Sequence, residues 1–207
     1  MRLFKQLFVA AFLLLSTHAF ADAQLGRDYQ ELNPAQPTHT GEKLEVLEFF
    51  FYGCTHCYHL HPQISAWEKK MPKDVELQYV PVIFRDSWEA MARTFYVLES
   101  MGQQRRLHDE LFNAWNVNNM VLSEQADVLD FLAPRGIDRA KFSMAYNSFS
   151  INSKVSRANQ MVRDYGIRGT PTLVVDGRYV ITGLTPEVTI QVLNDVIAKA
   201  RKEHGKH

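Results

Sequence analysis

The chain has 207 residues, its 23 Lys and Arg residues balance 23 Asp and Glu residues, and 46% of it is hydrophobic. This length and composition can bury a substantial core in one domain, or in one domain with an insert. The balanced charge lacks the basic excess that nucleic acids or anionic membranes attract, so we expect neither as a partner.

The N-terminal segment is predicted to be a secretory signal peptide. A short positive region precedes the apolar run 7–15, which is too short to span a bilayer. Ala19 and Ala21 then supply small residues at the two positions that a signal peptidase recognises. We expect residues 1–21 to be removed after Ala21; the alternative is a membrane anchor that is never cleaved. No later stretch is apolar enough for a transmembrane helix, so an integral membrane protein is not expected.

The first half of the remaining chain predicts a strand, a helix and a second strand. Residues 22–43 are polar and form an N-terminal lead-in. "LEVLEFFFY" (44–52) is mostly apolar and favours a buried strand. Apolar residues after Cys57 recur at helical spacing to about Lys70, and "VELQYVPVIF" (75–84) predicts the second strand.

The second half predicts a helical block followed by a hairpin and a last helix. Residues 86–150 carry apolar positions at helical spacing and no strand pattern, and another helix is expected over 154–165. Residues 170–182 contain two short β runs separated by Asp176 and Gly177, a pair typical of a tight hairpin. A Thr-Pro-Glu sequence then opens the last helix.

This order of elements predicts a single α/β sheet with a helical cap. A strand–helix–strand half and a strand–strand–helix half flank an all-helical insert. We therefore expect one discontinuous domain from residues 44–84 and 154–207, with residues 86–150 inserted between its halves.

The only two cysteines, Cys54 and Cys57, are separated by two residues. A disulfide stabilises mainly by closing a loop in the unfolded chain, and this pair encloses almost none, so a structural staple is not expected. Structural zinc usually needs four ligands in two separated pairs. His59 and His61 lie nearby but point in different directions on a helix, so no metal site is expected. Thiol–disulfide exchange remains, and an exported protein enters a compartment where disulfides persist.

Exchange needs an exposed thiolate and a second thiol within reach. Cys54 is predicted at a helix N-terminus, where free N–H groups and the helix dipole favour an anion. Cys57 lies one turn further in, so Cys54 is expected to attack and Cys57 to resolve. His56 would lower the pKa of Cys54 through a hydrogen bond or positive charge, which makes the disulfide a stronger oxidant. The alternative is a histidine that only covers the helix surface.

With these features the sequence resembles the DsbA family of periplasmic thiol:disulfide oxidoreductases, in the thioredoxin superfamily. The features that match are the export signal, Cys-x-His-Cys after an aromatic strand, the helical insert and "RGTPTLVVDGRY" (168–179). The likeness covers essentially the whole mature chain. It implies a thioredoxin-like fold with an inserted all-helical domain.

The resemblance also implies roles for single residues. Cys54 would be the nucleophile, Cys57 the resolving cysteine, and Thr55 and His56 the dipeptide that tunes the redox strength. The family most often has Pro-His at this dipeptide, so Thr55 departs from its pattern and leaves the redox strength open.

Three further positions carry over from the family. Thr170 and Pro171 would form the substrate-binding loop, whose X–Pro bond is cis; the family often has valine where Thr170 stands. Glu48 would be a buried acid that relays protons for the buried cysteine. A carboxylate in a buried strand is unfavourable unless it is protonated or paired. The alternative is an outward position, because Glu45 and Glu48 lie on opposite faces of a regular strand.

The function implied is a dithiol oxidase that introduces disulfide bonds into newly exported proteins in the periplasm. Reduced exported proteins would be its substrates, a DsbB-like inner-membrane quinone reductase would reoxidise it, and we expect a monomer that needs no organic cofactor. One alternative is a periplasmic disulfide reductase or isomerase, although residues 22–43 are too few for the N-terminal dimerisation domain of family isomerases. The other is a non-catalytic module that binds unfolded exported chains.

Overall fold

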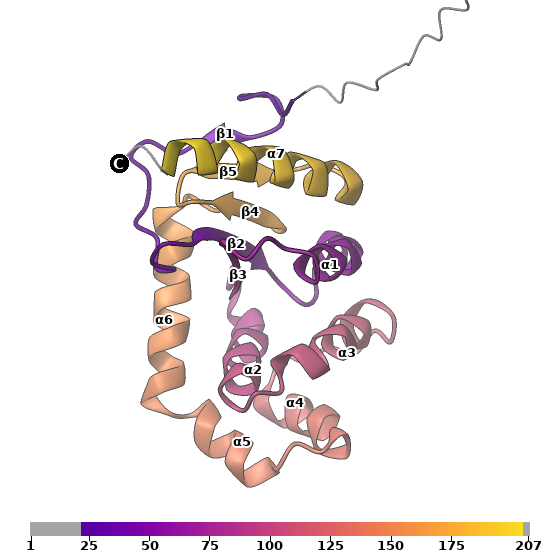
Figure 1. The fold of residues 1–207 in the computed structure, drawn as a ribbon. Helices are drawn as coiled ribbons and strands as arrows, with labels where there is room; N and C mark the ends of the chain where they lie inside the picture. Colours follow the sequence, from indigo (N-terminus) through magenta and orange to yellow (C-terminus); the bar gives the residue numbers. More distant parts are fainter. Residues whose placement is uncertain (1–21, 205–207) are drawn as a thin grey trace, which may run out of the picture.

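The structure is a computed structural model that describes residues 22–204. The predicted signal peptide, residues 1–21 with cleavage after Ala21, lies outside the described residues. The five strands form one sheet with the order β1-β5-β4-β2-β3; α7 lies on one side of it and α6 on the other, while α1 lies beside α3 of the insert (Figure 1). The α/β fold and its helical insert are confirmed.

The sheet places β2 in its interior. β2 runs parallel to β3 and antiparallel to β4, and all of its residues are buried. Cores on both faces of the sheet contain β2 side chains, which explains why the β2 sequence is nearly continuously apolar rather than alternating. The five strands are β1 (Gln30–Glu31), β2 (Leu44–Phe50), β3 (Val75–Pro81), β4 (Thr172–Val175) and β5 (Tyr179–Thr182).

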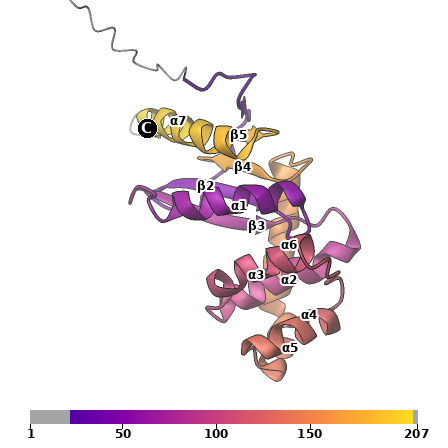
Figure 2. The same cartoon turned by 90° about the vertical axis from the view of Figure 1, so that its right-hand side faces the viewer.

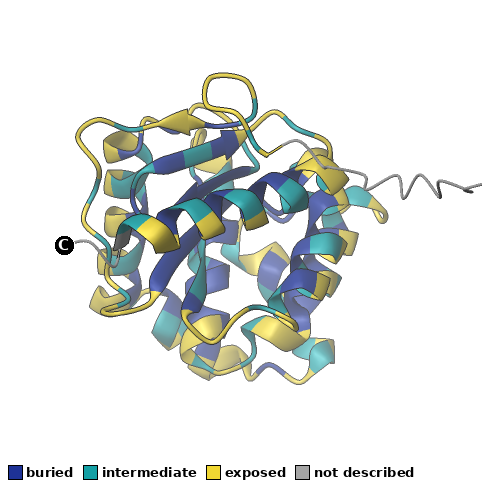
Figure 3. Cartoon of the chain, turned by 45° about the horizontal axis from the view of Figure 1, so that its top comes forward, coloured by how far each residue is buried: buried dark blue, intermediate teal, exposed yellow. Residues whose placement is uncertain are grey.

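Helices cover both faces of the sheet. Side chains of α1 and α7 pack together on one side with Leu44 and Val46 of β2, whereas Leu47 and Phe49 belong to a second core shared with the insert. Buried residues accordingly line the inner faces of the helices, and exposed residues face outward (Figure 3). The α-helices are α1 (Thr55–Glu68), α2 (Glu89–Ser100), α3 (Gln104–Asn116), α4 (Gln125–Leu132), α5 (Arg139–Tyr146), α6 (Phe149–Asp164) and α7 (Pro186–His204), with short 3-10 turns at Asp86–Trp88 and Ala133–Arg135.

Helix α6 begins earlier than the sequence predicted. The expected start near residue 154 was wrong, because Ser148 caps the helix with its side chain accepting from the Ile151 N–H at 3.3 Å. Phe149 is therefore the first helical residue. The helix is continuous from the insert to the sheet, as Figures 1 and 2 show.

The predicted hairpin is confirmed, and the lead-in contributes a strand that was not predicted. Asp176 and Gly177 connect β4 to β5 with φ angles of 52° and 64°, the left-handed values that a tight hairpin turn requires. In the lead-in, Gln30 pairs with Val180 of β5 in an antiparallel register. Two residues are too few to produce an alternating pattern, so sequence periodicity could not reveal β1.

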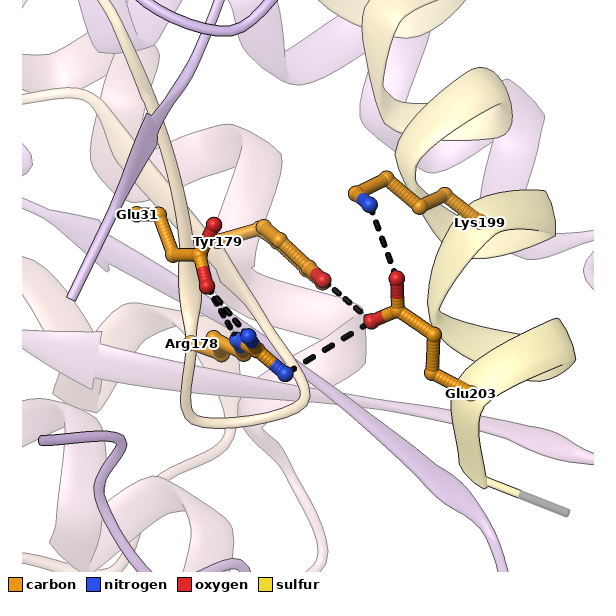
Figure 4. Close-up of polar contacts among 5 residues, drawn as sticks. All are labelled: Glu31, Arg178, Tyr179, Lys199 and Glu203. Carbon is orange, nitrogen blue, oxygen red and sulfur yellow. Dashed lines mark hydrogen bonds and ion pairs between the residues drawn. The ribbon is translucent and has the colours of Figure 1, made fainter. Parts of the chain in front are cut away.

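An ion-pair network holds the lead-in, the hairpin and the last helix together (Figure 4). The Arg178 guanidinium pairs with Glu31 and lies 3.6 Å from Glu203. Glu203 also accepts from the Tyr179 hydroxyl and pairs with Lys199 at 2.8 Å. Because a carboxylate shared among several donors is better fixed than an isolated surface pair, this network helps to anchor β1 at the sheet edge.

Gly177 and Gly102 form a matched pair for testing the hairpin. Both have positive φ, but a Cβ at Gly177 would lie 2.0 Å from the Gln36 carbonyl oxygen, whereas nothing lies within 4 Å at Gly102. Gly102→Ala should lower the free energy of unfolding by about 1–2 kcal/mol from backbone strain alone. Gly177→Ala should lower it by about a further 1–3 kcal/mol, because the lead-in must shift. Denaturant melts measure both values, and equal losses would contradict the close contact with Gln36.

Candidate active site

The candidate active site is the turn between β2 and α1. Cys54 is the N-cap residue of α1, with extended backbone angles, and its sulfur accepts from the Cys57 N–H at 3.4 Å. Cys54 is partly exposed, whereas Cys57 is fully buried, and both are free thiols in the structure. A sulfur at this position faces the free N–H groups of the first helical turn, as the sequence predicted.

The two thiols have opposite acidities. The pKa of Cys54 is lowered from 9.0 to about 5, most strongly by a hydrogen bond from the Cys57 side chain, against the opposing effect of burial. The Thr170 side chain and the backbone N–H groups of Cys57 and His56 act in the same direction. Burial raises the pKa of Cys57, and the nearby charges of Cys54 and Glu48 raise it further. At neutral pH, Cys54 is therefore a thiolate and Cys57 a thiol.

The loop before β4 faces the Cys54 sulfur. The predicted cis bond between Thr170 and Pro171 is confirmed. The Thr170 carbonyl oxygen lies 3.3 Å from Cys54 Sγ. This contact suits a thiol that donates to the carbonyl, which taken alone favours the protonated sulfur; the net effect of the surroundings is still to lower the pKa of Cys54.

A groove of about 490 Å³ extends from this loop along the start of α7. Its walls come from the loop, β5 and the first turns of α1 and α7, and they combine apolar side chains with threonine hydroxyls. The groove is lined, among others, by His56, Leu60, Pro171, Ile181, Leu184 and Thr189.

Aromatic side chains flank the turn beside Cys54. Phe51 stacks on Trp88 with ring centroids 3.8 Å apart, and Phe84 lies 5.8 Å beyond Trp88. Trp115 of α3 packs edge-on against Phe51 at 5.3 Å. Phe84 is 40% exposed, so part of this aromatic group is available to an apolar partner.

The dipeptide between the cysteines is exposed. His56 contributes its backbone N–H to the Cys54 sulfur, but its imidazole has no hydrogen-bond partner among residues 22–204. Thr55 is also exposed at the first position of α1. The tuning roles of the Thr55 and His56 side chains stay predictions.

Glu48 is buried, and the outward alternative was wrong. Its neighbours in the sheet are Tyr79 on β3 and Leu173 on β4, and it is 1% exposed. Burial, followed by the charge of Cys54, raises the pKa of Glu48 to about 8. Its Oε2 atom has no hydrogen-bond partner in the described chain. A carboxyl group that can hold a proton near neutral pH thus lies close enough to affect Cys57.

Two side-chain contacts that α3 makes near the cysteines were not predicted from the sequence. Tyr52 Oη shares a hydrogen bond of 2.7 Å with His108 Nδ1, and His61 Nε2 lies 2.5 Å from Asp109 Oδ1. The partners are 56 and 48 residues apart in the chain, so no local pattern could predict them.

Neither a metal cluster nor a membrane span is found in the described part of the chain. Among residues 22–204, no group of three or more His, Cys, Asp and Glu side chains could hold a metal ion. In the same range, no helix is long and apolar enough to cross a membrane.

An acidic, accessible thiol beside a buried one, facing a cis-proline loop on a thioredoxin-like sheet, defines the class of thiol:disulfide oxidoreductases. The family model described as "DSBA-like thioredoxin domain" matches residues 83–193. The chain belongs to the DsbA family of thiol:disulfide interchange proteins, and it is a thiol:disulfide oxidoreductase.

Named relatives and solved structures agree with this membership. The thiol:disulfide interchange protein DsbA of Pseudomonas syringae pv. tomato is 34% identical over 197 residues, covering 93% of this chain and 92% of the relative. That of Azotobacter vinelandii is 37% identical over 184 residues, covering 87% and 86%. The crystal structure of Pseudomonas aeruginosa DsbA superposes with a TM-score of 0.83 at 35% identity, covering 87% of this chain and 96% of that one.

The acidity of Cys54 can be tested by following thiolate absorbance against pH in the reduced protein. We expect a midpoint near 5, and a higher one in Cys57→Ala, which lacks the strongest hydrogen-bond donor to the sulfur. A midpoint near 9.0 in the unsubstituted protein would contradict the geometry of the turn.

The lowered pKa of Cys54 also makes the stability of the reduced protein depend on pH. The pKa of Cys54 is lower in the folded chain than in the unfolded chain, so the unfolded chain binds more protons between pH 5 and 9. The stability of the reduced protein relative to Cys54→Ser should therefore rise with pH across this window and be lost as pH falls through 5. Denaturant melts at several pH values measure this difference.

Proposed function

We propose that this chain is a dithiol oxidase that introduces disulfide bonds into newly exported proteins by exchange through Cys54 and Cys57. The observation that carries the proposal is the opposite acidity of the two thiols. Because the Cys54 thiolate is stabilised only in the reduced protein, the Cys54–Cys57 disulfide tends to be reduced and so acts as an oxidant.

The first step is attack on the accessible sulfur. A client thiolate bonds to Cys54 Sγ, the Cys54–Cys57 bond breaks, and Cys57 leaves with the electron pair. The buried Cys57 thiolate then takes a proton, for which the Glu48 carboxyl group, with its pKa of about 8, is the internal donor. Glu48 regains the proton from solvent before the next cycle.

The second step releases the oxidised client. A second client thiolate attacks the client sulfur of the mixed disulfide, a new client disulfide forms, and Cys54 leaves as the stabilised thiolate. The client has lost two electrons, and the two thiols of the enzyme hold them. A DsbB-like quinone reductase in the inner membrane then takes up these electrons and restores the disulfide.

Thr170 and Pro171 are proposed to bind the client beside the reacting sulfur. A client bonded to Cys54 lies next to the Thr170 carbonyl group, which is 3.3 Å from Cys54 Sγ. An extended client backbone could pair with this carbonyl, while its side chains reach the groove of about 490 Å³. His56 lines this groove and Thr55 is exposed beside it in the chain, and both are proposed to affect client contact and the potential.

The place of action follows from the proposed export of the chain. We propose that residues 1–21 are a signal peptide cleaved after Ala21, that the mature protein acts in the periplasm as a monomer, and that it needs no organic cofactor. The proposed discontinuous domain of 44–84 and 154–207, with its insert at 86–150, is the functional unit.

The proposal is tested by the redox equilibrium with glutathione together with oxidative refolding of a reduced client protein. We expect an equilibrium that favours the reduced enzyme, and client disulfides that form only with the oxidised enzyme. Cys54→Ala should abolish refolding activity. An equilibrium that favours the oxidised enzyme would indicate a reductase, and unchanged client protection by Cys54→Ala would indicate a binding module. Either result would overturn the proposal.

Glu48→Gln tests the proton transfer, with Glu45→Gln as its control. Glu45 is buried in the same strand, but its carboxylate accepts from the His39 N–H at 3.0 Å. Glu48→Gln should slow the reduction of the enzyme by dithiols on the order of tenfold or more, because the leaving Cys57 thiolate loses its proton donor. Glu45→Gln should leave this rate unchanged, and equal rates in all three proteins would rule out a relay through Glu48.

Glu48 should also affect stability in a pH-dependent way. Its pKa is raised from 4.5 to about 8 in the folded chain, so the folded chain binds more protons than the unfolded chain in that window. Its contribution to stability is present below pH 4.5 and is lost as pH rises through 8. The reduced Glu48→Gln protein should therefore gain stability over the unsubstituted protein as pH rises from about 4.5 to 8, which denaturant melts can measure.

A further inference from the structure

Helix α3 of the insert contacts the active-site turn at several points along one of its faces. α3 lies beside α1 (Figures 1 and 2). The residues of α3 that reach the turn and α1 recur at intervals of about one helical turn, which places them on one stripe of the helix. They are His108, Asp109, Phe112, Trp115 and Asn116.

The most direct contact is made by Asn116. Its Nδ2 donates to the Tyr52 carbonyl oxygen at 2.8 Å and to the Phe112 carbonyl oxygen at 2.9 Å. Tyr52 follows the end of β2 and is two residues before Cys54, so its carbonyl group lies in the connection that carries the nucleophile. The half-buried amide of Asn116 thereby joins the insert to the backbone of the reactive turn.

The side chain of Tyr52 is held by the same helix. The Tyr52 hydroxyl forms a hydrogen bond with His108 Nδ1, and both side chains are buried. Burial holds the pKa of His108 well below its usual value, so this is a bond between neutral groups. One residue further along the turn, a Cβ at Gly53 would lie 2.7 Å from Trp115 Cε3. The backbone at Gly53 therefore packs directly against α3.

We propose that α3 positions the exchange site and that Asn116 is the residue through which the insert holds the turn carrying Cys54. The Cys54 sulfur is stabilised by N–H groups of the first turn of α1, one of them at 3.4 Å. Such contacts depend on the direction of the sulfur as well as its distance. A turn released at Tyr52 lets Cys54 move relative to those N–H groups. This inference rests on the proposed exchange at Cys54.

Asn116→Ala tests the proposal, with Asn113→Ala as its matched control. Asn113 is on the same helix, is exposed, and makes no side-chain hydrogen bond within residues 22–204. Asn116→Ala should raise the midpoint of the Cys54 thiolate titration. It should also shift the glutathione equilibrium about three- to tenfold toward the oxidised enzyme, the size expected for one hydrogen bond that matters mainly in the reduced form. Asn113→Ala should change neither value.

A purely structural role for Asn116 predicts a different result. The melting temperature would fall in Asn116→Ala, while the thiolate midpoint and the glutathione equilibrium would match those of Asn113→Ala, and this would overturn the inference. If Asn116→Ala does not fold, Asn116→Leu keeps a similar volume and removes the donor without adding a charge, and the same two readouts apply. A failure of the unsubstituted protein to exchange with glutathione would instead overturn the proposed function, so the two failures are distinguishable.

Discussion

The chemistry of this protein depends on the different environments of two sulfur atoms that are one helical turn apart. Cys54 caps α1 and meets N–H groups, whereas Cys57 is fully buried beneath it. The first environment favours a thiolate and the second a thiol. Any change that exposes Cys57 or turns Cys54 away from the helix start reduces this difference, and with it the tendency of the disulfide to accept electrons.

The strand that leads to the two cysteines, β2, also buries carboxyl groups that lower the stability of the sheet. β2 is covered on both faces and ends at Phe50. Phe51 and Tyr52 are still buried, and the chain first becomes partly exposed at Gly53 and Cys54. The same strand buries two carboxyl groups. Glu45 Oε2 accepts a backbone hydrogen bond, whereas Glu45 Oε1 and Glu48 Oε2 have no partner in the described chain. An uncompensated carboxyl group in a core opposes folding. Packing therefore does not explain why Glu48 is buried, whereas the proposed proton transfer to Cys57 does.

Sequence predicted the parts of this site that are encoded locally. Asp176 and Gly177 specify their hairpin through backbone conformation, and the apolar run of β2 specifies a buried strand. The position of Cys54 follows from the strand that precedes it. The contacts of α3 could not be predicted, because they join residues far apart in the chain through packing alone. For His56, the sequence indicated an imidazole beside the sulfur, whereas the structure shows that its backbone N–H makes the contact.

Three separate segments meet at Cys54: its own turn, the loop at Thr170, and α3 of the insert. The first two adjoin the ends of β2 and β4, and they are the segments proposed to bring the thiolate and a client together. The insert adds a third contact, since Asn116 hydrogen-bonds to the turn and is not among the residues that line the groove proposed for clients. Thr55 and His56 are exposed, so the client contact and the redox tuning proposed for them would change together on substitution. Under the proposed role of α3, a substitution at Asn116 would change how strongly oxidising the disulfide is, while the residues of the proposed client groove stay the same.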